Sequence, residues 1–173
     1  GYREGHPLRT RTLTETLQDD GGYATALVGR YMHQSPYEAA YGFERRVLGS
    51  TYITDDDYAA MLDREVPALG GMRGIGLSYN GWQAKPWPLP EHLHPTNWVV
   101  QQARRVLAEA AATEADEDDE GGGRRPLFLT VSFYAPHPPL IPPAFYMERY
   151  LHLDLPDPAI GDWATLPPGP STG

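Results

Sequence analysis

The 173-residue chain contains no cysteine, which excludes disulfides and thiolate metal ligands within it. It is also poor in basic residues, because 14 Lys and Arg stand against 23 Asp and Glu, a formal net charge of −9. A nucleic-acid-binding surface needs clustered cations, so this class of partner is excluded. No apolar run approaches the ~20 residues of a membrane span. No signal-peptide pattern is visible, but the chain begins with Gly, so we expect its N-terminus to be missing and leave its compartment open.

What the chain does have points to a folded, loop-rich protein. Hydrophobic residues make up 40% of it and aromatic residues 11%, enough to anchor a core. With 18 Gly and 18 Pro, the composition predicts one globular domain rather than a disordered chain. We therefore expect short helices and strands joined by long loops.

Two apolar segments predict the fold class. Residues 23–28 and 127–133 are almost continuously small or apolar, which is typical of strands buried on both faces of a mainly parallel sheet. Helices are predicted at residues 13–20, 55–66 and 97–112, where apolar positions recur at helical spacing. Parallel strands need crossover connections, so the fold class is α/β. We expect the two strands to be neighbours, or nearly so, with the 97–112 helix packed on their sheet.

Capping residues precede each predicted helix. Thr12 and Glu15 form a capping box for the first helix. Thr54 with Asp57 is predicted to cap the second helix, and Thr96 the third. These signals place the start of each helix within a residue or two.

Two segments between these elements are predicted to be loops. Residues 69–95 are rich in Gly and Pro and show no periodicity, which indicates a long structured loop. Residues 113–125 contain six acids within seven residues and then three glycines, which predicts a flexible surface insertion. The spacing of these acids does not fit an EF-hand calcium loop.

His137 is the leading candidate for a functional residue. It follows the 127–133 strand in an Ala-Pro-His-Pro-Pro run, and ligand-binding groups gather at the carboxyl ends of parallel strands. The flanking prolines restrict the backbone and would hold the imidazole in one direction. A histidine fixed there suits an anionic substrate; the alternative is a turn histidine that only satisfies nearby backbone groups.

Cationic candidates accompany His137. Arg30 and His33 follow the 23–28 strand, so they are expected at the same edge of the sheet. The functional groups of Arg30 and His137 should then lie within roughly 10 Å of each other and reach one tetrahedral anion. An arginine binds such an anion through two parallel hydrogen bonds. Lys85, in the 69–95 loop, is a further candidate for substrate binding at the mouth of the site.

Two motifs resemble the sulfatase family of the alkaline-phosphatase superfamily. Residues 127–139 are similar to its apolar strand ending in Ala-Pro-His-x-Pro, and a Pro-rich entry into a helix follows. Residues 21–30 are similar to the Gly-Tyr turn and strand before the family's Gly-Lys-x-His motif. The resemblance extends over residues 13 to about 163. It implies part of an alkaline-phosphatase-like three-layer sandwich with a mainly parallel sheet.

The resemblance also implies sulfuric ester hydrolysis, in which formylglycine attacks a sulfate monoester that calcium and cationic side chains hold. Arg30 stands where the family has a sulfate-contacting Lys, and His137 where it has a histidine that binds sulfate or protonates the leaving oxygen. His33, one residue later than the family's second histidine, is a further catalytic candidate. The partner implied is a small-molecule or carbohydrate sulfate ester.

Departures from the family pattern limit what this chain can do. It lacks the Cys/Ser-x-Pro-x-Arg signature whose first residue becomes formylglycine, and it lacks the Asp-containing pairs that bind calcium. No metal ligand is therefore predicted here, and both cofactors are expected elsewhere in the full-length enzyme. We expect residues 1–173 to be a single partial domain, an internal piece that is catalytically incomplete.

Two other functions stay open at this point. A phosphonate monoester or phosphodiester hydrolase of the same superfamily would share the strand-end histidine and differ in its metals and pocket. A non-catalytic relative would bind anions or glycans through the aromatic-rich loop. The sequence gives no indication of the oligomeric state.

Overall fold

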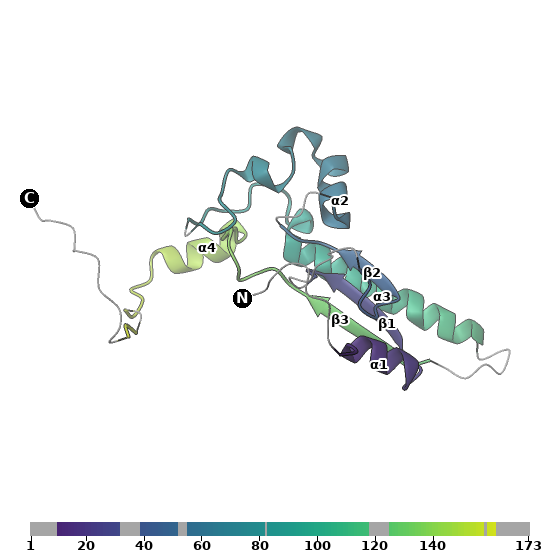
Figure 1. Ribbon diagram of the computed structural model, residues 1–173. Coiled ribbons are helices and arrows are strands. Elements are labelled where there is room, and N and C mark those ends of the chain that lie inside the picture. The colour runs from purple at the N-terminus through teal and green to yellow at the C-terminus, as the bar shows by residue number, and fades with distance from the viewer. Residues whose placement is uncertain are drawn as a thin grey trace, which may run out of the picture.

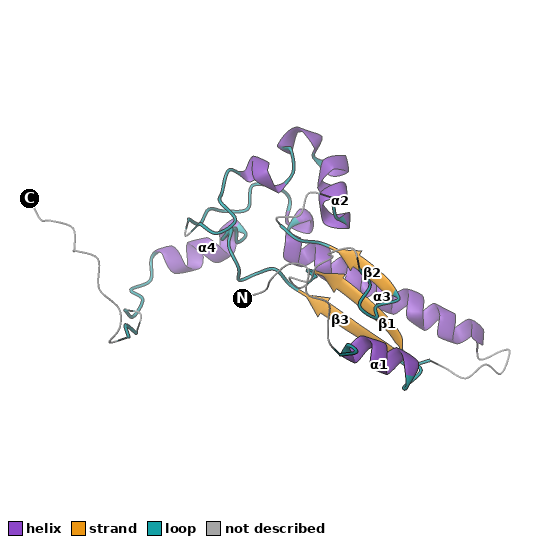
Figure 2. Cartoon of the chain, in the orientation of Figure 1, coloured by secondary structure: helices purple, strands orange, loops and turns teal. Residues whose placement is uncertain are grey.

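The structure is a computed structural model that describes residues 10–31, 39–51, 55–81, 83–117, 125–157 and 159–161. The described elements follow the order α1 (Leu13–Asp19), β1 (Ala24–Gly29), β2 (Arg45–Leu48), α2 (Asp57–Glu65), η1 (Pro67–Leu69), η2 (Met72–Ile75), η3 (Glu91–Leu93), α3 (Pro95–Glu117), β3 (Leu127–Ser132) and α4 (Ala144–Leu151). Figure 1 shows their arrangement, and Figure 2 separates helices from strands.

The three described strands form one parallel sheet in the order β2-β1-β3. In the pairing of β1 with β3, Ala24 lies opposite Leu127 and Gly29 opposite Ser132. The predicted strands at 23–28 and 127–133 are thereby confirmed as parallel neighbours, and the fold is α/β. The arrowheads in Figure 1 point toward the region of α2 and α4, so the carboxyl ends of the strands face those helices.

One face of the sheet is covered by α3, which lies behind it in Figure 1. Val99, Ala103 and Val106 of α3 are buried in one cluster with Ala26 and Val28 of β1. Alternate residues of a strand point to the same face, which explains why positions 26 and 28 both meet α3. The predicted packing of this helix on the sheet is confirmed.

The bounds of α3 differ from those predicted. The helix begins at Pro95 rather than residue 97, and the Nδ1 atom of His94 accepts the backbone N–H of Thr96 at 3.2 Å, so His94 and not Thr96 caps it. It ends at Glu117 rather than at residue 112. Ala and Glu dominate that last stretch and favour helix, so the start of the segment predicted to be a flexible insertion is helical. Residues 118–124 lie outside the described residues.

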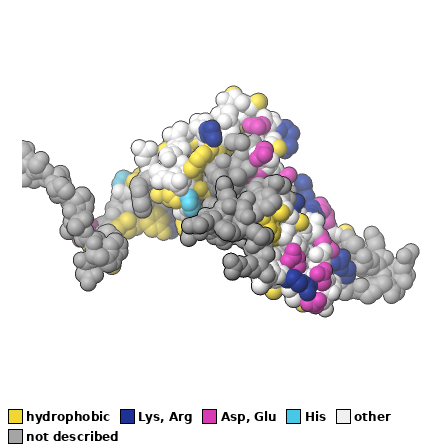
Figure 3. Space-filling model, in the orientation of Figure 1, with side chains coloured by type: hydrophobic (Ala, Val, Ile, Leu, Met, Phe, Trp, Pro, Cys, Tyr) yellow, Lys and Arg dark blue, Asp and Glu magenta, His cyan; other side chains and the backbone are white. Residues whose placement is uncertain are grey.

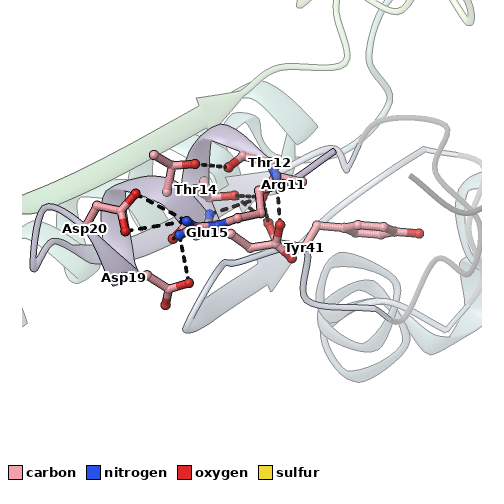
Figure 4. A network of polar contacts seen from close by, with 8 residues as sticks. Arg11, Thr12, Thr14, Glu15, Asp19, Asp20 and Tyr41 are labelled. Atoms are coloured by element: carbon pink, nitrogen blue, oxygen red, sulfur yellow. Dashed lines mark hydrogen bonds and ion pairs between the residues drawn. The ribbon is translucent and has the colours of Figure 1, made fainter. Parts of the chain in front are cut away.

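The capping box predicted for helix α1 is confirmed. The side chain of Thr12 accepts the backbone N–H of Glu15 at 3.1 Å, and Glu15 in turn accepts the backbone N–H of Thr12 at 2.7 Å. The hydroxyl groups of Thr12 and Thr14 both donate to the carbonyl oxygen of Tyr41, and Arg11 pairs with acidic residues at the far end of the helix (Figure 4). These contacts tie α1 to the turn that precedes β2.

The start of α2 differs from the expectation. Its cap is Asp56, whose carboxylate accepts the backbone N–H of Ala59 at 2.9 Å and that of Ser50 at 2.6 Å. Asp57 instead accepts the N–H of Leu48 at 2.7 Å, at the end of β2. Residue 54, predicted as part of the cap, lies outside the described residues. The two aspartates therefore join the end of β2 to the start of α2.

The 69–95 segment contains the short 3₁₀ helices η2 and η3 and lies alongside the chain that follows β3. Ala84 forms an isolated parallel bridge with Leu140, and the backbone N–H of Trp87 donates to Pro142 at 2.9 Å. The Trp87 side chain is buried, and its indole N–H donates to Pro90 at 3.1 Å. This segment holds the Pro-rich run after β3 in place.

Helix α4 stands apart from the sheet (Figure 1). Its large side chains are mostly exposed, including Phe145, Tyr150 and Leu151 at 61 to 62%. Hydrophobic side chains gather over this part of the molecule in Figure 3. Among the described residues no helix is both long and apolar enough to cross a membrane.

Candidate functional site

Arg30 is held at the carboxyl edge of the sheet by its backbone. It follows Gly29, the last residue of β1, and its N–H donates to the carbonyl oxygen of Ser132 at 3.0 Å. Gly29 has a φ of +102°, and a Cβ atom there would lie 1.9 Å from that same oxygen. Only glycine permits β1 and β3 to approach this closely, so the direction in which the chain delivers Arg30 depends on it.

His137 lies in a turn just after β3. Its backbone N–H donates to the carbonyl oxygen of Tyr134 at 3.1 Å. Its Nδ1 atom is 2.8 Å from the carbonyl oxygen of Pro138, and because a carbonyl can only accept, Nδ1 carries the proton. The residue is exposed, and its Nε2 atom is left to face another partner.

Tyr134 joins these two candidates. The guanidinium carbon of Arg30 lies 4.9 Å from the centre of its ring, and the His137 ring lies 4.8 Å from that centre at an angle of 51°. The two distances together keep the guanidinium and the imidazole less than roughly 10 Å apart, as expected from the strand topology. The tyrosine is only 8% exposed. Arg30 and His137 are therefore brought to one place, while their chemical roles stay a prediction.

A cavity of about 790 Å³ adjoins this place. Tyr134 and His137 line it together with Thr51, which follows β2. Its walls are mostly apolar and come from the Pro-rich run after β3, the start of α3, and α4. The carboxyl edge of the sheet thus opens into a space large enough for an organic ligand.

His94 is buried in the wall of this cavity. Because Nδ1 accepts from Thr96, the proton is on Nε2, which donates to the carbonyl oxygen of Ile141 at 3.1 Å. The indole of Trp87 packs edge-on against the ring at 5.2 Å between centres. Burial lowers the pKa of His94, which favours the neutral ring that makes these bonds. This histidine, one of those in the predicted loop, joins α3 to the Pro-rich run.

The remaining two candidates are placed differently. The Lys85 ammonium group donates to the carbonyl oxygen of Ile75, and its backbone N–H donates to Leu140 at 3.1 Å. Neither Lys85 nor Arg30 is among the described residues that line the cavity. His33 lies outside the described residues. Lys85 therefore adds no cation to the pair formed by Arg30 and His137.

Two buried hydroxyl groups lie beside the site, and sequence reasoning gave no signal for them. Ser50 and Thr51 are each 2% exposed, and within the described part of the chain neither side-chain oxygen has a hydrogen-bond partner. Both line a small cavity of about 10 Å³ that also touches Tyr134, close to the least space that one water molecule needs. Thr51 lines both this cavity and the larger one.

The residues present do not fit a calcium site. Within the described ranges, no three His, Asp or Glu side chains gather where they could hold a metal ion. Asp56 and Asp57, the acids nearest the carboxyl edge, accept backbone N–H groups instead. A precursor of formylglycine is missing as well, because the chain has no cysteine and none of its serines begins the x-Pro-x-Arg pattern.

Comparison with known proteins connects the chain to one enzyme group. No protein-family model matches it. It is 31% identical over 179 residues to a protein named "Arylsulfatase" from Clostridium perfringens (strain 13 / Type A), a match that covers 95% of the chain and 35% of the relative. The chain thus spans about a third of that relative's length. The resemblance to the sulfatases is confirmed in that nearly all of the chain is homologous to part of this arylsulfatase.

Proposed function

We propose that the protein to which this chain belongs hydrolyses sulfate monoesters, and that this segment contributes the groups that bind the anionic sulfate. The observation that carries the proposal is the meeting of Arg30 and His137 on Tyr134 at the carboxyl edge of a parallel sheet. The relationship to an arylsulfatase supports the same chemistry.

Each residue has a role that its geometry allows. Arg30 offers a planar fork that forms two parallel hydrogen bonds to a tetrahedral anion. In a chain with a net charge of −9, such a site must draw its attraction from local cations rather than from the overall field. Positive groups fixed where charge develops stabilise the transition state strongly. His137 can donate a hydrogen bond through Nε2 when protonated, either to sulfate or to the leaving oxygen.

The fold proposed for the full domain is the three-layer sandwich of the alkaline-phosphatase superfamily, of which residues 1–173 would form part. The parallel sheet with α3 on one face supports it. Formylglycine and calcium would belong to other parts of that protein, because the described residues of this chain fit neither.

Expression of the complete coding sequence that contains this chain tests the proposal. The purified protein is assayed against a chromogenic aryl sulfate, a phosphonate monoester and a phosphodiester under one set of conditions. We expect sulfate turnover to exceed the other two. Preferential turnover of the phosphonate or the phosphodiester would indicate a phosphonate monoester or phosphodiester hydrolase instead of a sulfatase. No turnover of any ester would favour an anion-binding or glycan-binding protein.

Variants then connect the activity to this segment. His137→Ala should mainly lower kcat, whereas Arg30→Ala should raise KM and lower kcat together, as loss of an anion clamp does. Arg30→Lys should retain part of the binding because it keeps the charge and loses the fork. His152→Ala, at an exposed histidine just after α4, is the matched control. Wild-type kinetics in both site variants would remove this segment from the active site.

A further inference from the structure

We infer that Tyr134 is a positioning residue of the anion site, whose ring holds the Arg30 guanidinium and the His137 imidazole in a fixed relation. What the site binds rests on the proposed function, whereas the positioning itself rests on the contacts around the ring. Neither sequence motif singles out this tyrosine.

The first step is that Tyr134 itself is immobile. Its side chain is 8% exposed and lies in the wall between the larger and the smaller cavity. Its carbonyl oxygen accepts the N–H of His137 and so closes the turn after β3. The ring is therefore set by the sheet and by the packing beneath it, and not by the exposed turn above.

The second step is that both cationic candidates depend on this ring. A guanidinium 4.9 Å from a ring centre is within the range of a cation–π contact, which strengthens when the ring is shielded from water. The imidazole, 4.8 Å from the same centre, gains a second cation–π contact whenever it is protonated. Arg30 leaves the sheet from β1 and His137 from β3, so Tyr134 is a common reference for groups delivered by two different strands.

When His137 is protonated, Arg30 and His137 carry charges of the same sign. A guanidinium and an imidazolium near one another repel until an anion binds between them. The negative face of an aromatic ring close to both groups offsets part of this repulsion and keeps the pair organised before the anion arrives. Preorganisation of this kind is what makes charged groups effective toward a transition state.

The experiment compares Tyr134→Leu with Tyr134→Phe in the complete protein that contains this chain. Leucine removes the ring, whereas phenylalanine keeps it and removes only the hydroxyl group. NMR spectra report the chemical shifts of the His137 ring protons and of the Arg30 Nε–H, each of which feels the ring current of Tyr134. Inorganic sulfate is then titrated while the same signals are followed. Leu62→Ala, which truncates a fully buried side chain of α2 that lines neither cavity, is the matched control for lost stability.

We expect Tyr134→Leu to abolish the ring-current shifts of both residues and to weaken sulfate binding roughly tenfold. Tyr134→Phe should keep the shifts and bind sulfate within about twofold of the wild type. Leu62→Ala should lower the stability and leave both signals and the sulfate affinity unchanged. Unchanged shifts in Tyr134→Leu, or equal losses in the leucine and phenylalanine variants, would overturn the inference.

The inference and the proposed function fail in different ways. If sulfate perturbs neither signal in the wild type, the proposed role of the pair in anion binding fails, while the ring-current shifts still decide the role of Tyr134. If sulfate binds and Tyr134→Leu retains full affinity, the function stands and the positioning role falls.

Discussion

One buried carboxyl group should contribute less to the stability of this chain as pH rises from about 4 to about 7. Asp56 is 6% exposed, and burial raises its pKa from the ordinary 3.8 to about 6, against the two backbone N–H groups that favour its charged form. Asp57 and Asp55 add smaller repulsions in the same direction as burial. Asp56 is thus protonated in the folded state over a range where it is ionised in the unfolded state.

The direction in which the free energy of unfolding changes with pH follows from proton linkage. Between pH 3.8 and about 6 the folded state binds more protons at Asp56 than the unfolded state, so the free energy of unfolding decreases as pH rises. The stabilising contribution is complete below the unfolded pKa and is lost above the folded one. Each unit of difference in pKa corresponds to about 1.4 kcal/mol, so the loss across this range is about 3 kcal/mol.

Asp56→Asn isolates this effect from the other acids of the chain. Asparagine is an equally good helix cap and cannot ionise, so the variant should match the wild type at pH 4 and exceed it by about 3 kcal/mol at pH 7. Urea unfolding at low protein concentration is the assay, since the chain has an isoelectric point near 5.0. A difference between variant and wild type that stays constant with pH would refute the reasoning.

Glu44→Gln provides a control of opposite sign. The hydrogen bond from Arg125, at 2.8 Å, holds the pKa of Glu44 below its ordinary value. The folded pKa is lowered here, so this contribution is present above the unfolded pKa and is lost as pH falls through the folded one. The wild type should therefore lose stability relative to Glu44→Gln on acidification. If the difference in free energy of unfolding between wild type and variant changes with pH in the same direction for Asp56→Asn and for Glu44→Gln, overall charge and not these two sites sets the pH dependence.

Three further outcomes are expected. Thr51→Val should raise the free energy of unfolding by about 1 kcal/mol, because a methyl group of similar size replaces a buried hydroxyl that has no partner among the described residues. If urea unfolding instead gives a lower free energy of unfolding for the variant, water satisfies the hydroxyl in the wild type. Gly29→Ala should lower the free energy of unfolding by at least about 3 kcal/mol, since its Cβ would lie 1.9 Å from the Ser132 oxygen at a φ of +102°; a fall below 1 kcal/mol would show that β1 and β3 can separate easily. The chain of residues 1–173 with added calcium should show no turnover of a chromogenic sulfate, because it lacks a nucleophile and metal ligands; turnover that survives repurification would contradict this.

The strands β1 and β3 could be predicted because they are buried between neighbours, which requires apolar side chains in nearly every position. The strand β2 was missed for the opposite reason. Its four residues are all half-buried, and two of them are arginines. Arg45 extends to Glu109 on α3, and Arg46 donates to the carbonyl oxygen of Ala39 at 2.9 Å. Long side chains that cover the sheet with their apolar stems and end in polar contacts do not resemble a strand in sequence.

The predicted starts of α3 and α2 were wrong where contacts with distant segments, and not the local capping sequence, determine which residue caps the helix. Thr96 is a common capping residue, yet the cap of α3 is His94, whose ring is fixed by Ile141 on a segment 47 residues away. The sequence indicated a helix start near a His-Pro-Thr run, but not which residue would be held in place by the rest of the fold. Similarly, Asp56 caps α2, whereas Asp57, predicted to form the cap together with Thr54, accepts the N–H of Leu48 at the end of β2.

The candidate site shows the same division between what topology fixes and what packing fixes. Arg30 and His137 could be expected to meet because both follow parallel strands, and strand ends are set by the apolar pattern. The ring on which they meet could not be foreseen, since Tyr134 belongs to the strand-end sequence only as one more aromatic residue. The positioning role inferred for Tyr134 rests on the burial of its side chain and on its contact with the Arg30 side chain, which follows the neighbouring strand β1. Lys85 illustrates the converse: a cation in a predicted loop is attractive as a ligand group, but its ammonium group is used to hold that loop through Ile75. The proposed anion site therefore rests on residues whose position the strand ends fix, and not on the presence of charge in a loop alone.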